Sequence, residues 1–186
     1  MAFLSLFDSF RNEAALIGRL VAGYGGLEID LLLCVLEAKR ETDPVIKSMF
    51  RARGETQRLD IADALARPSF KKFSLETEFG MAVGAIRYCL KIRNQYAHSY
   101  FWEEKNGKLS FGSLEDIAKS HNPLDVGSIA LLNIDEALLR KQLAYFEYAE
   151  AWMHFLNEEV QVIRKKTIAR TFSRPKALAR PPLHIS

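Results

Sequence analysis

The segment that begins at Arg93 and reads Arg-Asn-Gln-Tyr-Ala-His-Ser-Tyr combines residue types and spacing that suit chemistry. A histidine titrates near neutral pH, so His98 suits the transfer of a proton as an acid or a base. Arg93 offers a fork of N–H donors that can bind a phosphate group bidentately. Asn94 lies one helical turn before His98, so its amide can hydrogen-bond the imidazole and orient it. The segment therefore predicts acid-base chemistry beside an anionic group.

The spacing of Arg93 and His98 constrains how the two side chains can act together. Five residues correspond to about 140° around a regular helix, so both side chains cannot easily reach one phosphate. Either the helix unwinds between Tyr96 and His98, or a second copy of the chain brings its own motif alongside. The sequence leaves both arrangements open.

The residues RNQYAH at 93–98 resemble the R-[polar]-x-x-x-H signature of HEPN domains, small all-helical proteins that carry this motif late in a bundle helix. The resemblance extends over about residues 10–163, and the motif and the helix layout carry it. Many HEPN proteins are metal-independent ribonucleases that act as dimers, often as toxins or anti-phage effectors, and others have lost activity. The resemblance implies that Arg93 and His98 are a catalytic pair and that Asn94 is the adjacent polar residue.

The function implied is that of a HEPN-like, metal-independent endoribonuclease of a toxin-antitoxin or phage-defence system. Cleavage of RNA without a metal needs a base for the 2′-OH proton, an acid for the leaving oxygen, and a cation beside the phosphate. One motif supplies one histidine, so we expect a homodimer with this helix at its two-fold axis, acting on single-stranded or loop RNA. The alternative is a catalytically inactive HEPN-like helical module that binds an unknown partner.

Tyr100 extends the motif to R-x4-H-x-Y. That form resembles HEPN toxins whose partner, a nucleotidyltransferase-type antitoxin, silences them by attaching AMP to the tyrosine. The other interpretation is that Tyr100 and Trp102 belong to a hairpin and pack on the bundle. This chain departs from the minimal toxins because it is longer and carries a hairpin region and a basic tail.

Apolar periodicity indicates the elements that must position these residues. It predicts helices at about 10–38, 44–52, 55–65, 75–97 and 134–163, with Pro68 ending the third and Asn133 capping the last. Asp43 and Pro44 are expected at the N-cap and first position of the second helix. The expected fold is all-α: an antiparallel four- to five-helix bundle with a small β-hairpin insertion.

The insertion is expected at about residues 100–130. Short apolar segments on either side of Asn106 and Gly107 predict a β-hairpin. Residues 112–133 contain glycines and an Asn-Pro pair, and they predict mostly loop with one helical turn.

Charge is distributed unevenly along the 186 residues, although the net charge is only +3. Residues 164–186 contain seven basic residues and no acidic one, so the chain before them carries −4 and this tail carries +7. We therefore expect a helical domain at 1–163 and a basic, flexible tail at 164–186. The tail either attaches the protein to RNA, DNA or an acidic partner, or it is a solvated terminus.

The sequence supports no metal or cofactor. Glu150, His154 and Glu158 share one face of the last predicted helix, but three ligands on consecutive turns of one helix rarely converge. Cys34 and Cys89 are expected to be reduced core thiols. No apolar stretch is long enough for a membrane span and no secretory signal precedes the first helix, so we expect a cytoplasmic protein without membrane partners.

Overall fold

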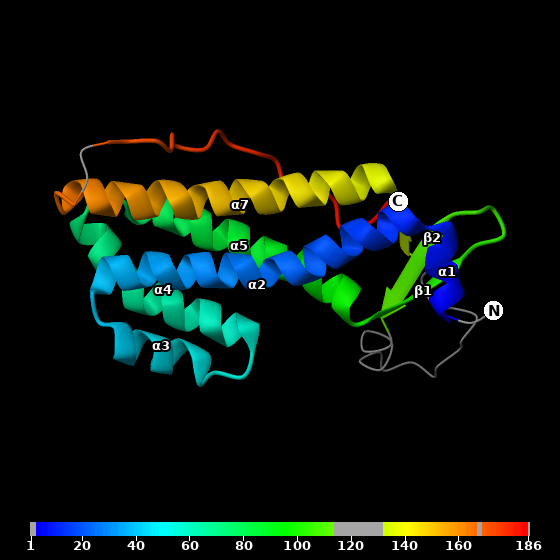
Figure 1. Cartoon of the computed structure of the whole chain (residues 1–186), viewed down its shortest axis with the longest axis horizontal. Coiled ribbons are helices and arrows are strands. Elements are labelled where there is room, and N and C mark those ends of the chain that lie inside the picture. The colour runs from blue at the N-terminus through cyan, green and yellow to red at the C-terminus, as the bar shows by residue number, and fades with distance from the viewer. Residues whose placement is uncertain (1–2, 114–131, 167–168, 186) are drawn as a thin grey trace. The chain divides into compact units, whose positions relative to one another are not determined.

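A computed structural model describes residues 3–113, 132–166 and 169–185 of this chain. The protein is mostly helical with a small three-stranded antiparallel sheet, so the broad prediction of an all-α protein with a hairpin is confirmed (Figure 1). The elements are α1 (Phe3–Ser9), α2 (Arg11–Lys39), α3 (Thr42–Phe50), α4 (Glu55–Lys72), α5 (Glu76–Ala97), β1 (Ser99–Glu103), β2 (Leu109–Ser113), β3 (Leu132–Ile134) and α7 (Glu136–Ile163). None of the described helices is long and apolar enough to span a membrane.

The chain divides into two compact units. Unit 1 comprises Met1–Ala22, Lys91–Ala144 and Arg180–Ser186, and unit 2 comprises Gly23–Leu90 and Tyr145–Ala179. Helices α2, α5 and α7 therefore contribute residues to both units. The sequence predicts a division into 1–163 and 164–186, whereas the described tail residues 169–185 belong partly to one unit and partly to the other.

Unit 1 contains the sheet, whose strands follow the order β1-β2-β3. Strand β1 pairs with β2 in antiparallel fashion, which confirms the predicted hairpin. Phe101 lies opposite Phe111 in this pairing, and both side chains are buried. Their rings lie 6.4 and 5.5 Å from the ring of Tyr96 in α5, measured between ring centroids. An aromatic cluster thus anchors the sheet to the C-terminal turns of α5.

Unit 2 has a core of large side chains from its helices. Phe70 of α4 and Phe79 of α5 are fully buried and stacked, with ring centroids 4.2 Å apart. Cys34 and Cys89 are buried free thiols, as the sequence predicts. Burial raises the pKa of both thiols above the ordinary value, so they stay neutral and behave as small apolar core residues.

The prediction that Pro68 ends the third helix is wrong, because α4 continues through it to Lys72. A proline inside a helix removes one backbone hydrogen bond and costs about 3 kcal/mol. The turn after Pro68 carries Phe70, and burial of a phenylalanine contributes about 1.5–3 kcal/mol. The burial of Phe70 against Phe79 therefore offsets much of the cost of the proline.

The beginnings of two other helices also differ from prediction. Asn133 lies in β3, and the first turn of α7 is capped instead by Asp135, whose Oδ1 accepts a hydrogen bond from the Leu138 N–H at 2.7 Å. The N-cap of α3 is Glu41, so Pro44 is not the first helical residue. The helical turn predicted within 112–133 falls largely at 114–131, outside the described residues.

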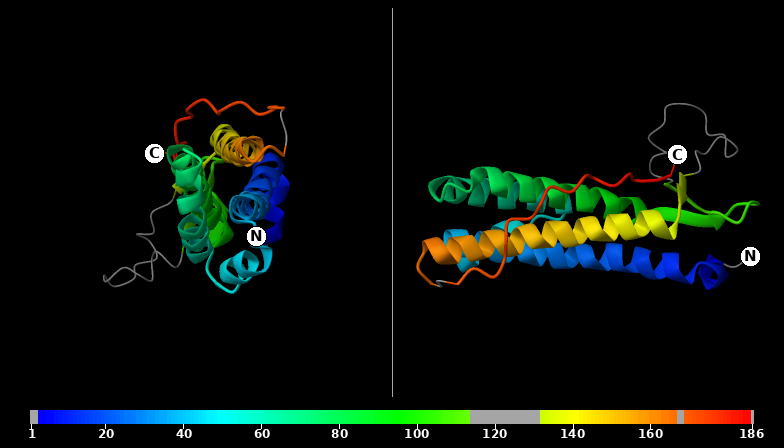
Figure 2. Two further views of the ribbon diagram at one scale, coloured as in Figure 1. Left: turned by 90° about the vertical axis from the view of Figure 1, so that its left-hand side faces the viewer. Right: turned by 90° about the horizontal axis from the view of Figure 1, so that it is seen from above.

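After α7, residues 169–179 of unit 2 form an extended segment that runs back along this helix (Figure 2). Arg170 pairs with Glu159 at 2.6 Å, and the Thr171 N–H donates to Glu158 at 2.8 Å. Phe172 contacts an earlier residue of α7, because its ring stacks on that of His154 with ring centroids 5.1 Å apart. The basic residues that the sequence assigns to a flexible tail thus include several that bind acidic groups of the same chain.

Candidate functional site

The motif predicted from the sequence lies in unit 1, where α5 gives way to β1. Helix α5 ends at Ala97, His98 occupies a turn, and Ser99 begins β1. His98 is therefore not on the regular helix that carries Arg93. The helix stays regular through Tyr96 and Ala97, and the two arrangements expected for Arg93 and His98 both stay predictions.

Arg93 and Asn94 are brought together in the last full turns of α5. Arg93 Nη1 donates a hydrogen bond to Asn94 Oδ1 at 2.9 Å, and both side chains are partly buried. The sequence predicts a hydrogen bond between Asn94 and His98, but the one observed for Asn94 is with Arg93. The amide oxygen of Asn94 thus holds the guanidinium rather than the imidazole.

His98 and Tyr100 both lie on the surface of unit 1. His98 is exposed in its turn, and Tyr100 is 59% exposed in β1. Tyr100 and Trp102 both belong to the hairpin, as the second interpretation expects, and the Trp102 side chain is half-buried. His98 and Tyr100 are thus two exposed residues of the motif, two positions apart in the sequence.

A buried polar network holds this end of α5 in place. The Tyr96 hydroxyl donates to Gln142 Oε1 at 2.6 Å, and burial raises the pKa of Tyr96 so that the hydroxyl keeps its proton. Gln142 in turn donates to the carbonyl of Pro182 at 2.9 Å, and Gln95 donates to the carbonyl of Leu183 at 2.8 Å. The end of the chain is thus hydrogen-bonded to both helices of unit 1 that flank it.

Sequence reasoning missed this network. A signal was present, because Gln142 lies four residues after Leu138 and three before Tyr145, on the apolar face of the last helix, and a buried amide requires partners. Its partner carbonyls lie in the tail at 182 and 183, and nothing in the spacing of the sequence brings these positions to residue 142.

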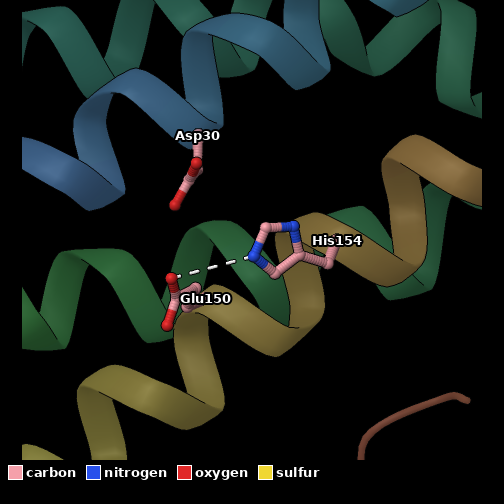
Figure 3. A group of neighbouring side chains, drawn as sticks. All are labelled: Asp30, Glu150 and His154. Carbon is pink, nitrogen blue, oxygen red and sulfur yellow. Dashed lines mark ion pairs between the residues drawn. The ribbon is translucent and has the colours of Figure 1, made fainter. Parts of the chain in front are cut away.

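A second group of chemically capable side chains lies in unit 2 (Figure 3). Asp30 of α2 points toward Glu150 and His154 of α7, and their ligand atoms lie within 4.8 Å of one another. His154 Nε2 and Glu150 Oε1 are 3.7 Å apart. The sequence identifies Glu150 and His154 but groups them with Glu158, which instead accepts hydrogen bonds from Thr171 and the Phe172 N–H.

The electrostatics of this second group show two acidic groups that share one basic neighbour. Burial raises the pKa of the Asp30 carboxyl, the His154 ring opposes that shift, and the Glu150 carboxylate adds to it. Two like charges close together disfavour each other, so the group favours a positive charge at its centre. Sequence reasoning missed Asp30 because it lies far from α7 along the chain.

The two sites suit different chemistry. The end of α5 combines an arginine with an exposed histidine, which suits proton transfer beside a phosphate. The group in unit 2 combines one imidazole with two carboxylates, which suits a cation. Comparison with known proteins finds no matching family model, no similar curated protein and no similar solved structure. The function is therefore inferred from the residues and their geometry.

Proposed function

We propose that this chain is a HEPN-like, metal-independent endoribonuclease that acts as a homodimer on single-stranded or loop RNA. The observation that carries the proposal is the end of α5, where the exposed His98 directly follows the helix that holds Arg93 against Asn94. The bundle architecture expected of a HEPN domain is part of the same proposal, and the mostly helical fold supports it.

In the proposed reaction, His98 of one chain takes the proton from a ribose 2′-OH. The freed oxygen attacks the adjacent phosphorus, and the bond from phosphorus to the 5′ oxygen of the next nucleotide breaks. The partner subunit's His98 donates a proton to that leaving oxygen, so the products are a 2′,3′-cyclic phosphate and a 5′-hydroxyl. Arg93 neutralises the charge that develops on the phosphate.

Asn94 is a positioning residue in this reaction. A lone arginine side chain has many rotamers, and ordering it costs free energy. The hydrogen bond from Arg93 Nη1 to Asn94 Oδ1 restricts the guanidinium before any substrate arrives. Preorganised charge of this kind costs no reorganisation in the transition state.

Affinity for RNA is proposed to come from the surroundings of Arg93 rather than from the tail. Lys166, Arg170 and Arg174 of the tail region pair with Glu37, Glu159 and Glu78 at 2.6, 2.6 and 3.1 Å. A charge that is paired within the chain is less available to a phosphate backbone. We therefore expect RNA binding to depend only weakly on salt, as a small number of phosphate contacts requires.

The exposure of Tyr100 supports a regulatory role for it within the same proposal. Its hydroxyl lies two residues after His98, so an attached AMP group would add negative charge and bulk beside the site. A nucleotidyltransferase-type antitoxin is the proposed partner for that reaction. A toxin-antitoxin or phage-defence system is therefore part of the same proposal.

The proposal is tested with an RNA that contains single-stranded loops, incubated with the purified protein in excess EDTA. We expect cleavage that leaves 2′,3′-cyclic phosphate ends, and we expect none at a position where the ribose is replaced by 2′-deoxyribose. Cleavage should fall by at least about 100-fold in His98→Ala, the usual contribution of one acid or base. The absence of cleavage across RNAs of varied sequence would overturn the proposal.

A further inference from the structure

We propose that Asp30, Glu150 and His154 form a binding site for one divalent transition-metal ion, with zinc as the ion that fits the three donors best. The inference concerns unit 2 alone and does not depend on the proposed ribonuclease activity. The ion would join α2 to α7 within that unit (Figure 3).

The distances fit an ion placed between the side chains. His154 Nε2 and Glu150 Oε1 are 3.7 Å apart, which is too long for a hydrogen bond. Two ligand atoms of a tetrahedral zinc ion, each about 2.0–2.1 Å from the metal, lie about 3.3 Å apart. The ligand atoms of the three residues lie at most 4.8 Å from one another, so side-chain movements of about 1.5 Å or less bring them to the spacing of zinc ligands.

The origin of the ligands also fits. Glu150 and His154 are four residues apart on one helix, a spacing that places two ligands on the same face. Asp30 comes from a different helix, so the three donors approach from two directions rather than from one. Glu158, the third residue on the same face of α7, is engaged by Thr171 and Phe172 and is not needed.

The His154 ring is held in orientation. The Phe172 ring stacks on it at 5.1 Å with an interplanar angle of 16°. Metal-binding histidines are commonly fixed by a hydrogen bond from the other ring nitrogen, and here the stacked Phe172 ring restricts the same rotation. The His154 and Glu150 side chains are also 41% and 51% exposed, so an ion can reach them from solvent and a water molecule can complete the coordination.

The donor set selects the class of metal. One imidazole nitrogen with two carboxylate oxygens suits zinc and the neighbouring transition metals, whereas magnesium and calcium prefer oxygen ligands alone. The two carboxylates neutralise the charge of a divalent ion, and the ion removes the repulsion between them. Three protein ligands leave at least one coordination position for water.

The test is isothermal titration of the untagged full chain with zinc alone and then with magnesium alone. We expect one zinc ion per chain, no measurable heat from magnesium, and binding at least about tenfold weaker in each of Asp30→Asn, Glu150→Gln and His154→Ala. His184→Ala and Glu147→Gln are the matched controls, since each removes the same kind of group from a position outside the cluster. Both controls should bind zinc as the wild type does.

Two results would overturn the proposal. One is that the wild-type chain gives no zinc heat at any concentration at which it stays folded. The other is that the three ligand variants bind zinc as tightly as the controls do, which would indicate a surface histidine elsewhere. Circular dichroism of each variant separates loss of the site from loss of the fold. The visible absorption of bound cobalt gives a second readout, because tetrahedral coordination produces intense bands.

Discussion

His98 and His154 show two ways in which one residue type is prepared for chemistry. His98 lies exposed in a turn between α5 and β1, and its proposed partner Arg93 is held by the neighbouring Asn94. His154 lies within α7, with its ring against Phe172 and its Nε2 facing Glu150. The exposed position of His98 lets its imidazole contact a substrate. The stacked position of His154 keeps its imidazole next to Glu150. The comparison predicts that the two histidines have separable roles.

The largest effect is expected for Arg93. Replacement by lysine keeps the charge but removes the planar fork, so it removes both bidentate phosphate binding and the contact to Asn94 Oδ1. Arg93→Lys should therefore lower RNA cleavage by about 100-fold, measured as kcat/KM on a fixed RNA. Arg140→Lys, the same change at an exposed arginine of α7, should leave the rate within about twofold of the wild type. Equal activity of the two variants would remove Arg93 from the proposed mechanism.

A second prediction concerns the network that supports the first site. Tyr96→Phe leaves Gln142 Oε1 buried without its donor, which should lower the free energy of unfolding by about 1–3 kcal/mol. The matched control Tyr148→Phe also removes a hydroxyl but keeps the ring contacts with Tyr145 and Trp152, and it should change the free energy by less than about 0.5 kcal/mol. Urea denaturation of both variants measures the difference. Equal stabilities would show that the Tyr96 hydroxyl contributes nothing to this end of α5.

A third prediction sharpens the description of His154 as a fixed ring. Phe172→Ala removes the stacking partner without touching any proposed ligand, so zinc affinity should fall by about tenfold while one ion still binds. Phe172→Leu keeps an apolar contact, so its zinc affinity should lie between those of Phe172→Ala and the wild type. A titration in which Phe172→Ala binds zinc as the wild type does would show that the ring needs no support.

The smallest effect concerns how the tail segment is attached beside His154. Hydrogen bonds from Thr171 and Phe172 hold the pKa of Glu158 below its ordinary value of 4.5. Because the pKa of Glu158 is lower when the segment is attached, the ionised carboxylate stabilises the attached state at a pH above the ordinary pKa. This stabilisation is lost as the pH falls through the lowered pKa. Pepsin cleavage at Phe172, relative to a free peptide of the same sequence, should therefore rise as the pH falls below 4.5 and through the lowered pKa of Glu158.

A matched variant isolates the role of Glu158 in that pH dependence. Glu158→Gln keeps the shape of the side chain and cannot titrate, so its relative cleavage rate should stay constant over the same pH range. A wild-type rate that is equally constant would show that Glu158 does not hold the segment.

The helices, the hairpin and the motif could be predicted because each depends on residues close together in the sequence. The period of apolar residues located α2, α5 and α7 to within a few residues, and Asn106-Gly107 located the turn of the hairpin. The predictions are wrong where contacts between residues far apart in the sequence determine the local structure. Pro68 remains helical because Phe70 stacks on Phe79, and Asn133 joins β3 because it pairs with Ser110 of β2.

The same distinction separates the two sites. Arg93, Asn94 and His98 lie within six consecutive positions, so their spacing alone could indicate them. Asp30 approaches Glu150 and His154 only through the packing of α2 and α7 in unit 2, and no local pattern contains that information. The tail is similar, because its charge predicts attraction to acidic groups but does not identify Glu158 and Glu159 as the partners.

The most direct test of the central claim compares the two histidines in one cleavage assay in excess EDTA. Wild-type protein, His98→Ala and His154→Ala are incubated with the same RNA under the same conditions. We predict equal cleavage by the wild type and His154→Ala, and a loss of at least about 100-fold in His98→Ala. Cleavage by His98→Ala at the wild-type rate, or loss of cleavage by all three proteins in EDTA, would contradict a metal-independent reaction at His98.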